Sequence, residues 1–252
     1  MKKVAFCTLG CKVNQYETNG MIQEFKNKGY DIVEFDEVAD IYIVNTCTVT
    51  NMADRKSRQM LRKVKELNQK AILVACGCYA QVAKEELEKI PEIDLILGTN
   101  EKKEIVKYIE KYIEEKDNKT RDVITDVLHE EIYSDFGDVT FTEKTRAVIK
   151  VQDGCDRFCS YCIIPFARGH IRSRKKESVI SEITKIAEEG IQEVVITGIH
   201  LASYGRDFEE KYRLIDLLED INKIEKIKRI RLRIIRANIN KWRICWKISK
   251  IR

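Results

Sequence analysis

The chain has 252 residues, of which 44% are hydrophobic, so it can bury the core of one large domain or of two ordinary ones. Its first residues lead directly into a short apolar run, and no apolar stretch is long enough to cross a bilayer. These features argue against a secreted or membrane protein and predict a cytoplasmic location. The net charge of +5 comes from a basic segment that begins at Lys226 and has no acidic residue, so charge is weak support for nucleic-acid binding.

Short apolar runs alternate with amphipathic segments over the first hundred residues, which is the pattern of a parallel α/β sheet. The predicted strands cover residues 4–9, 32–35, 41–45, 72–75 and 95–97. The predicted helices cover residues 16–28, 53–68, 83–89 and 103–115. We therefore predict an N-terminal parallel α/β domain over residues 1–115.

A second α/β series is predicted further along the chain. The charged segment at residues 116–144 has little periodicity and is predicted to be a linker with room for a strand or two. The domain that follows, at residues 145–233, has predicted strands at 147–151, 193–197 and 230–232 and predicted helices at 178–189 and 212–221. This βαβαβ order is typical of the first part of a parallel (β/α) barrel, so the predicted fold class is α/β throughout.

Three cysteines lie close together in the sequence, at Cys155, Cys159 and Cys162. Three thiolates with these gaps on one loop can bind three irons of a four-iron cluster and leave the fourth iron open to a substrate or cofactor. The alternative is a structural zinc site with His170 as the fourth ligand, although zinc-binding thiols are usually paired two residues apart. The spacing favours the open cluster.

Three further cysteines, Cys11, Cys47 and Cys78, each follow the end of a predicted strand. The carboxyl ends of parallel strands open on one edge of a sheet, so these thiols could converge there and bind a second cluster. Two alternatives stay open from position alone. Cysteines at buried strand ends often act as small hydrophobic residues, and Cys76 could take the place of Cys78.

The sequence around the thiols resembles a known family. Residues 154–169, GCDRFCSYCIIPFARG, resemble the radical S-adenosylmethionine (SAM) superfamily and are most similar to its methylthiotransferase branch. The segments GCKVN, NTCTVT and GCYAQ, which contain the other three cysteines, resemble the cluster-binding segments of the same family. The resemblance extends from Lys3 to about Leu232 and leaves Cys7, Cys76 and Cys245 outside the pattern.

The resemblance implies two [4Fe-4S] clusters, each held by one set of three cysteines, and SAM as a further cofactor. In such enzymes one SAM molecule donates a methyl group to sulfur at the N-terminal cluster. A second SAM molecule is cleaved at the other cluster to a radical that takes hydrogen from the substrate. Tyr161 is a candidate contact for the adenine of SAM, with simple packing as the alternative. Thr197 and Gly198 are candidates for its methionine part, with an ordinary strand-to-loop glycine as the alternative.

Residues near the thiols also suggest a substrate. Lys12-Val13-Asn14, together with Arg157, are most similar to the MtaB group, whose members methylthiolate carbon two of N6-threonylcarbamoyladenosine next to the anticodon of tRNA. The alternatives are isopentenyladenosine in tRNA, a ribosomal protein, or a non-catalytic iron–sulfur or RNA-binding fragment. The implied partners are tRNA, an electron-donor protein and a sulfur donor, with no DNA and no membrane.

Two basic segments have their own interpretations. A run of four residues is suited to RNA phosphates, with a solvated face as the alternative; it consists of Arg168, His170, Arg172 and Arg174. The tail at residues 234–252 has no acidic residue, no glycine and no regular period. We interpret it as an aberrant basic tail from truncation or a shifted reading frame, with a genuine RNA-binding tail as the alternative.

Overall fold

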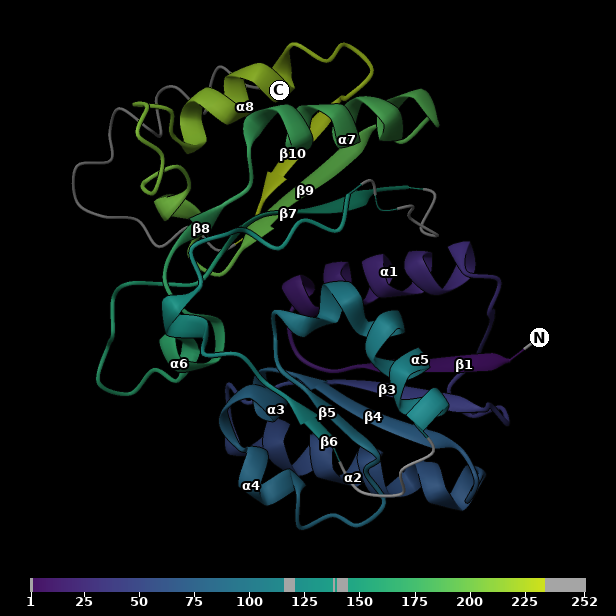
Figure 1. Cartoon of the computed structure of the whole chain (residues 1–252). Coiled ribbons are helices and arrows are strands. Elements are labelled where there is room, and N and C mark those ends of the chain that lie inside the picture. Colours follow the sequence, from purple (N-terminus) through teal and green to yellow (C-terminus); the bar gives the residue numbers. More distant parts are fainter. Residues whose placement is uncertain (1, 116–120, 138, 140–144, 234–252) are drawn as a thin grey trace. The chain divides into compact units, whose positions relative to one another are not determined.

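The computed structural model describes residues 2–115, 121–137, 139 and 145–233 (Figure 1). The chain folds into two compact units. The first contains Met1–His129 together with Cys159–Arg168, and the second contains Glu130–Phe158 together with Gly169–Arg252. Each unit is built on a sheet of its own.

The first unit is built on a six-stranded sheet in which all neighbouring strands are parallel. In spatial order its strands are β2 (Asp31–Val33), β1 (Lys3–Thr8), β3 (Ile41–Thr46), β4 (Ile72–Gly77), β5 (Leu95–Leu97) and β6 (Arg121–Val123). Every residue of β3 is buried, as expected for a strand that is covered on both faces. The predicted parallel α/β fold is confirmed here.

Helices cover both faces of this sheet. Figure 1 shows α1 and α5 on one face and α2, α3 and α4 on the other. Their bounds are α1 Lys12–Asn27, α2 Asn51–Leu67, α3 Cys78–Val82, α4 Lys84–Leu87 and α5 Ile105–Glu115. The short helix α6 (Ile164–Arg168) and the 3₁₀ turns η1 (Glu101–Glu104) and η2 (Val127–His129) complete the unit. Among the described residues, no helix has the length and apolar character needed to span a bilayer.

The second unit contains a four-stranded sheet with the order β10-β9-β7-β8. Its strands are β7 (Ala147–Asp153), β8 (Arg172–Ser173), β9 (Glu193–Gly198) and β10 (Arg229–Leu232). β7, β9 and β10 are parallel, whereas β8 is antiparallel to β7. The helices α7 (Lys176–Glu188) and α8 (Leu214–Asn222) pack their apolar sides on one face of the sheet (Figure 1). This sheet confirms the predicted opening part of a (β/α) barrel.

Several element boundaries differ from the sequence prediction. The segment predicted as a linker with room for a strand or two does contain a strand, β6, which pairs with β5; the 3₁₀ turn η2 in the same segment was not predicted. The helix predicted at residues 83–89 is shorter, since α4 covers only Lys84–Leu87. The prediction missed α3 at Cys78–Val82, which is separated from α4 by the non-helical backbone of Ala83. α1 begins four residues before its predicted start, directly after Cys11. The predicted tail at residues 234–252 lies outside the described residues.

The partly buried Glu24 on α1 should make stability depend on pH. Burial, with smaller contributions from Glu104 and Glu110, raises the pKa of Glu24 to about 7. The unfolded chain loses this proton near the ordinary value of 4.5, so stability should fall as the pH rises from about 4.5 to about 7. Because the side chain is partly exposed, we expect Glu24→Gln to add only about 1 kcal/mol at pH 8, or about 2–4 °C in Tm. It should add nothing at pH 4.

Thermal unfolding at the two pH values measures this effect. Glu66→Gln, at an exposed position on α2, is the matched control and should leave Tm unchanged at both. An equal gain from Glu24→Gln at pH 4 and pH 8 would show that the carboxylate charge is not the cause.

Candidate metal centre

Cys11, Cys47 and Cys78 all lie in the first unit, just beyond the ends of the neighbouring strands β1, β3 and β4. Cys11 is the N-cap residue of α1 and is exposed. Cys47 follows β3 directly and is buried, and Cys78 is the buried first residue of α3. The predicted positions at the carboxyl ends of parallel strands are therefore confirmed, whereas the role as cluster ligands stays a prediction.

Buried polar side chains tie the three cysteine segments together. The Nδ2 atom of Asn14 donates to the carbonyl oxygens of Leu9 and Thr46, at 2.9 and 3.0 Å. The Nδ2 atom of Asn45 donates in return to the carbonyl oxygen of Asn14 at 3.0 Å. The hydroxyl of Thr46 donates to the carbonyl oxygen of Cys76 at 2.6 Å. These bonds give the buried side chains polar partners, and they fix the segments relative to one another.

A glycine permits a close approach between two of these segments. Gly10 has a φ of +91°, in the left-handed region that favours glycine. A Cβ atom at this position would lie 2.5 Å from the Sγ atom of Cys47. Ser57 on α2 holds Cys47 from the other side, since its hydroxyl donates to the Cys47 carbonyl oxygen at 3.2 Å. The segment before Cys11 thus packs directly on the thiol of Cys47.

The pKa of the Cys47 thiol depends on burial and on the charges of the other two thiols. Burial raises the pKa of the Cys47 thiol, the negative charges of Cys78 and Cys11 raise it further, and Arg168 acts in the opposite direction. Among the described residues, no three His, Cys, Asp or Glu side chains are grouped closely enough to hold one metal ion. Thiolates of a four-iron cluster bind different irons, so they need not approach one another as closely as ligands of one ion do.

Cys76 differs from Cys78 in both place and chemistry. It lies within β4 and pairs with Asn45 of β3, so it belongs to the sheet and not to its edge. Burial raises the pKa of its thiol to about 12, which favours the protonated form that does not bind metal. Cys7, within β1, also has a raised thiol pKa because of burial. Both observations support the interpretation of Cys76 and Cys7 as residues outside the cluster pattern, and Cys245 lies outside the described residues.

The second set of thiols follows β7. Cys155 is buried, and its backbone N–H donates to the carbonyl oxygen of Gly169 at 3.0 Å. Cys159 and Cys162 are partly buried, and the N–H of Cys162 donates to the carbonyl oxygen of Cys159 at 2.8 Å. Phe158, directly before Cys159, has a φ of 41° although it is not glycine. Cys155 belongs to the second unit, and Cys159 and Cys162 belong to the first.

The start of this loop is anchored by close backbone packing. Gly154 has a φ of +68°, and a Cβ atom there would lie 1.7 Å from the carbonyl oxygen of His170. The carboxylate of Asp156 accepts from the Ile171 N–H at 3.1 Å and contacts the His170 ring at 2.8 Å. His170 is therefore a partner of Asp156. These contacts hold residues 154–156, at the start of the loop, against residues 170–171, which follow it.

The candidate SAM-binding residues have different surroundings. Tyr161 is 79% exposed, so the alternative that it is simply packed is wrong. Thr197 is buried, and a Cβ atom at Gly198 would lie 2.9 Å from the Oε1 atom of Gln152. Gln152 therefore fills the space that the missing side chain leaves. A SAM-binding role for Tyr161, Thr197 and Gly198 stays a prediction.

Gln152 is a residue that the sequence reasoning missed. Its side chain is buried, accepts from the His200 N–H at 2.7 Å, and donates to the Gly154 carbonyl oxygen at 2.7 Å. It thus connects the end of β9 with the start of the cysteine loop. Its position two residues before Gly154 carried no signal of its own, because glutamine fits equally well on a surface.

The three arginines of the basic run do not form an RNA-binding surface. Arg168, Arg172 and Arg174 are all buried, with at most 2% of their surface exposed. Each has partners within the protein; for example, the Nε atom of Arg174 lies 2.9 Å from Asp135, and its Nη1 atom pairs with Glu182. Buried guanidinium groups paired in this way cannot reach phosphates. The expectation of RNA contact is therefore wrong for these arginines, and so is the solvated-face alternative.

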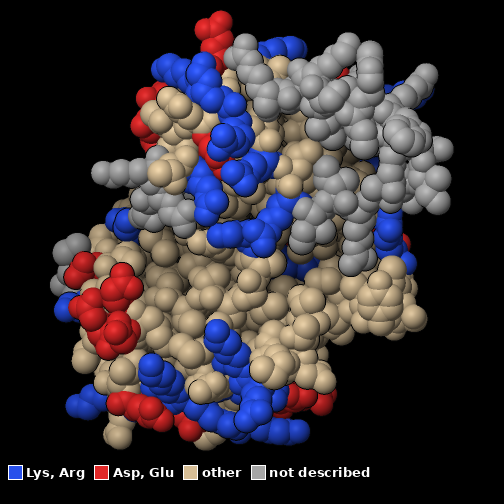
Figure 2. All heavy atoms as spheres, turned by 180° about the vertical axis from the view of Figure 1, so that it is seen from behind, with Lys and Arg blue, Asp and Glu red and all other residues tan. Residues whose placement is uncertain are grey.

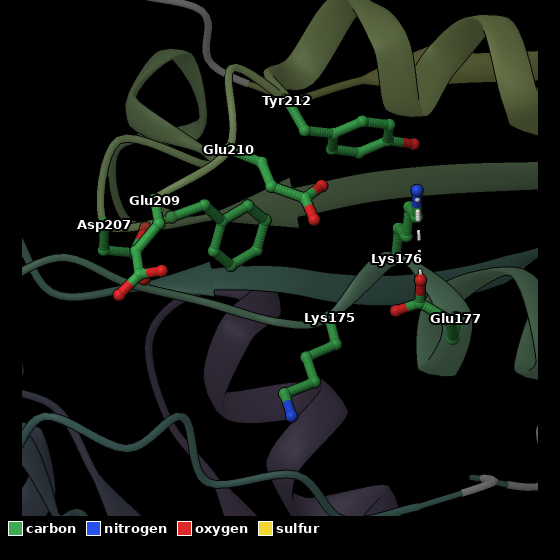
Figure 3. Close-up of a pocket in the computed structure, with 8 residues that line it drawn as sticks. Lys175, Lys176, Glu177, Asp207, Glu209, Glu210 and Tyr212 are labelled. Carbon is green, nitrogen blue, oxygen red and sulfur yellow. Dashed lines mark ion pairs between the residues drawn. The ribbon is translucent and has the colours of Figure 1, made fainter.

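The second unit also contains an open hollow of about 610 Å³ beside the N-terminus of α7. Figure 3 shows its lining, in which the Nζ atom of Lys176 lies 4.9 Å from the centre of the Tyr212 ring and 3.9 Å from Glu177. Two lysines, four carboxylates and two aromatic rings form the lining: Lys175, Lys176, Glu177, Asp207, Phe208, Glu209, Glu210 and Tyr212. The size suits a small molecule, but the lining combines both charges.

Charges of both signs also occur together on the surface. On the face drawn in Figure 2, groups of Lys and Arg side chains lie next to Asp and Glu side chains. On this face, the mixed pattern agrees with the view that charge is weak support for a nucleic-acid partner.

Comparison with known proteins identifies the two parts of the chain. Residues 3–98 match the model of the uncharacterized protein family UPF0004, and residues 149–247 match that of the radical SAM superfamily. The second match extends past Leu232 into the tail. A structure of the radical SAM methyltransferase TsrM from Kitasatospora setae, with tryptophan and a SAM analogue bound, has a TM-score of 0.60 at 14% identity. The match covers 88% of this chain and 51% of that one. This likeness shows a shared fold.

Two curated relatives are much more similar in sequence. A threonylcarbamoyladenosine tRNA methylthiotransferase, MtaB, from Aquifex aeolicus is 44% identical over 91% of this chain and 55% of its own length. A ribosomal protein uS12 methylthiotransferase, RimO, from Desulfitobacterium hafniense is 40% identical over 92% of this chain and 52% of its own length. The chain spans about half the length of these relatives. With a UPF0004 segment followed by a radical SAM segment, the chain belongs to the radical SAM methylthiotransferase family.

Proposed function

We propose that the chain adds a methylthio group to carbon two of N6-threonylcarbamoyladenosine next to the anticodon of tRNA. The observation that carries this proposal is the position of Cys11, Cys47 and Cys78 at the ends of three neighbouring parallel strands. A sheet edge with three thiols suits a cluster that handles sulfur. The thiol triplet after β7 suits a second cluster with an open iron.

The chemistry of the six cysteines and of their surroundings fits two iron–sulfur clusters. Thiolates are the preferred ligands of iron–sulfur clusters, and the Nε–H of Arg168 is directed to the Sγ atom of Cys78 at 3.2 Å, as expected beside an anionic group. Cys11, Cys47 and Cys78 would hold one [4Fe-4S] cluster, and Cys155, Cys159 and Cys162 the other. When bound, the two clusters and SAM would supply the electron transfer, the radical and the methylated sulfur that acid–base groups cannot provide.

The protein itself contributes position and exclusion of water. Asn14, Asn45 and Thr46 hold the three thiol segments of the first unit in a fixed relation. Burial of Cys47 and Cys78 limits the access of water to that part of the site. In the second unit, Gln152 fixes the start of the cysteine loop. The exposed ring of Tyr161 is free of the core and is available to contact the adenine of SAM.

The choice of substrate rests on few residues. Val13 and Asn14 are both buried, and Asn14 holds backbone groups, so the substrate distinction depends more on the partly exposed Lys12 and the exposed Arg157. The 44% identity to the tRNA enzyme supports the threonylcarbamoyladenosine substrate. The 40% identity to the uS12 enzyme supports a second candidate, methylthiolation of a ribosomal protein. The electron donor and the sulfur donor would be separate partners.

Anaerobic reconstitution tests the cluster assignment. We expect about eight irons per chain, because each set of three cysteines would hold one four-iron cluster. Replacement of Cys11, Cys47 and Cys78 by alanine should remove about half of the iron and leave reductive cleavage of SAM intact. The same replacement of Cys155, Cys159 and Cys162 should also remove half of the iron, but it should abolish cleavage.

Cys76→Ala and Cys7→Ala are the matched controls, since both thiols lie within strands of the same sheet. Both variants should keep the full iron content. Binding of iron without cleavage of SAM would instead favour a non-catalytic iron–sulfur module, and loss of iron on Cys76→Ala would contradict the ligand assignment.

The substrate prediction has its own measurement. The reconstituted chain, with SAM, reductant and a sulfide source, is given tRNA that carries threonylcarbamoyladenosine, tRNA that carries isopentenyladenosine, or ribosomal protein uS12. We expect mass spectrometry to find the methylthio group on threonylcarbamoyladenosine. A product on uS12 alone would refute the proposed substrate and leave the family chemistry intact.

The packing of Gly10 on Cys47 leads to a further prediction. Gly10→Ala should lower the iron content of the N-terminal cluster, because the new methyl group would displace the Cys47 thiol. Gly29→Ala is the matched control, since Gly29 also has a positive φ, +80°, but nothing lies within 4 Å of its Cβ position. Both substitutions should lower the free energy of unfolding by about 1–2 kcal/mol, because alanine disfavours a positive φ. If iron content is equal in the two variants, the close approach does not matter for the cluster.

A further inference from the structure

A buried arginine contacts one of the thiols of the first unit. Arg168 is the last residue of α6, and its side chain is completely buried. Its Nε atom lies 3.2 Å from the Sγ atom of Cys78. Its Nη2 atom lies 3.1 Å from the Glu17 carboxylate and also donates to the Oδ1 atom of Asn14. The guanidinium therefore connects a candidate cluster ligand with two residues of α1.

The same carboxylate is shared with a second buried cation. The Nζ atom of Lys102 pairs with Glu17 and lies 3.5 Å from the Oδ1 atom of Asn45. Lys102 is also completely buried, and Glu17 is 1% exposed. The group of Arg168, Lys102 and Glu17 thus contains two positive charges and one negative charge away from solvent.

A buried excess of positive charge is costly unless an anion lies beside it. The Nε–H of Arg168 is directed at the Cys78 sulfur, so Cys78 would provide that partner once it binds a cluster as a thiolate. A cluster held by three thiolates adds further negative charge at the same place, and it becomes more negative on reduction. The arrangement therefore favours a reduced, anionic cluster at this edge of the sheet.

We propose that Arg168 is a positioning residue of the N-terminal cluster, which orients the Cys78 thiolate and supplies the positive charge that raises the reduction potential of the cluster. This inference rests on the proposed function, because it takes Cys11, Cys47 and Cys78 as ligands. Hydrogen bonds to cluster sulfurs and nearby charges are both known determinants of cluster potential. Glu17 and Lys102 act with Arg168, since they set the net charge of the group.

The experiment uses the full chain with Cys155, Cys159 and Cys162 replaced by alanine, so that only the N-terminal cluster is reconstituted. A redox titration followed by electron paramagnetic resonance then gives the potential of that cluster. We expect Arg168→Gln to make reduction at least tenfold less favourable, which is about 59 mV for one electron. Glu17→Gln, which removes the negative charge, should shift the potential in the opposite direction. A purely structural role would not reverse the sign.

Two further variants separate charge from packing. Arg168→Lys keeps the positive charge but loses the planar fork, so its potential should stay closer to that of the parent. Arg174→Gln is the matched control: Arg174 is a buried arginine paired with carboxylates in the second unit, and this variant should keep the parent potential. Loss of iron in Arg168→Gln but not in Arg168→Lys would also support a role for the charge. Equal loss in both would refute it.

The failure of this inference can be told from the failure of the proposed function. If the parent variant with Arg168 intact binds no iron, the ligand assignment itself is wrong. If it binds about four irons but Arg168→Gln and Glu17→Gln leave the potential unchanged, the ligands stand and the role of Arg168 is refuted.

Discussion

Parallel pairing sets Thr8 opposite Asn45 and Thr46 opposite Gly77, so β1, β3 and β4 end at the same edge of their sheet. Each strand is followed within a few residues by a cysteine and then by a helix. Residues separated by more than thirty positions in the sequence are thereby brought into one region, without any of them being adjacent in the chain. The hydrogen bonds of Asn14, Asn45 and Thr46 depend on this register, and so does the close packing of Gly10 on Cys47.

The candidate metal centre of the first unit contains buried charged side chains beside its three cysteines. Side chains such as Glu17, Lys102 and Arg168 are stable there only as a group, because each satisfies the charge or hydrogen bonds of another. The segment Cys159–Arg168 belongs to the first unit, although the residues before and after it in the sequence belong to the second. Arg168 at the end of this segment therefore holds it in the first unit through hydrogen bonds and ion pairs with α1.

Much of this organisation could be predicted from the sequence. The strand-like apolar runs predict the parallel sheet, and the positions of six cysteines predict both candidate ligand sets. The surroundings of the charged residues could not be predicted in the same way. Arg168 and Glu17 are 151 positions apart, and no local pattern distinguishes a buried arginine from a solvated one. For the same reason Arg172 and Arg174 were interpreted as surface residues.

The three thiols of the first unit differ in their access to solvent, since Cys11 is exposed whereas Cys47 and Cys78 are buried. Oxidation of cysteine follows exposure and thiolate character, so oxidants in solution meet Cys11 before they meet the other two. In the protein without a bound cluster, oxidation of the three thiols would therefore begin at Cys11, with its sulfenic acid as the first product. The sheet beneath would stay intact, because Cys11 caps α1 and takes no part in the buried strands.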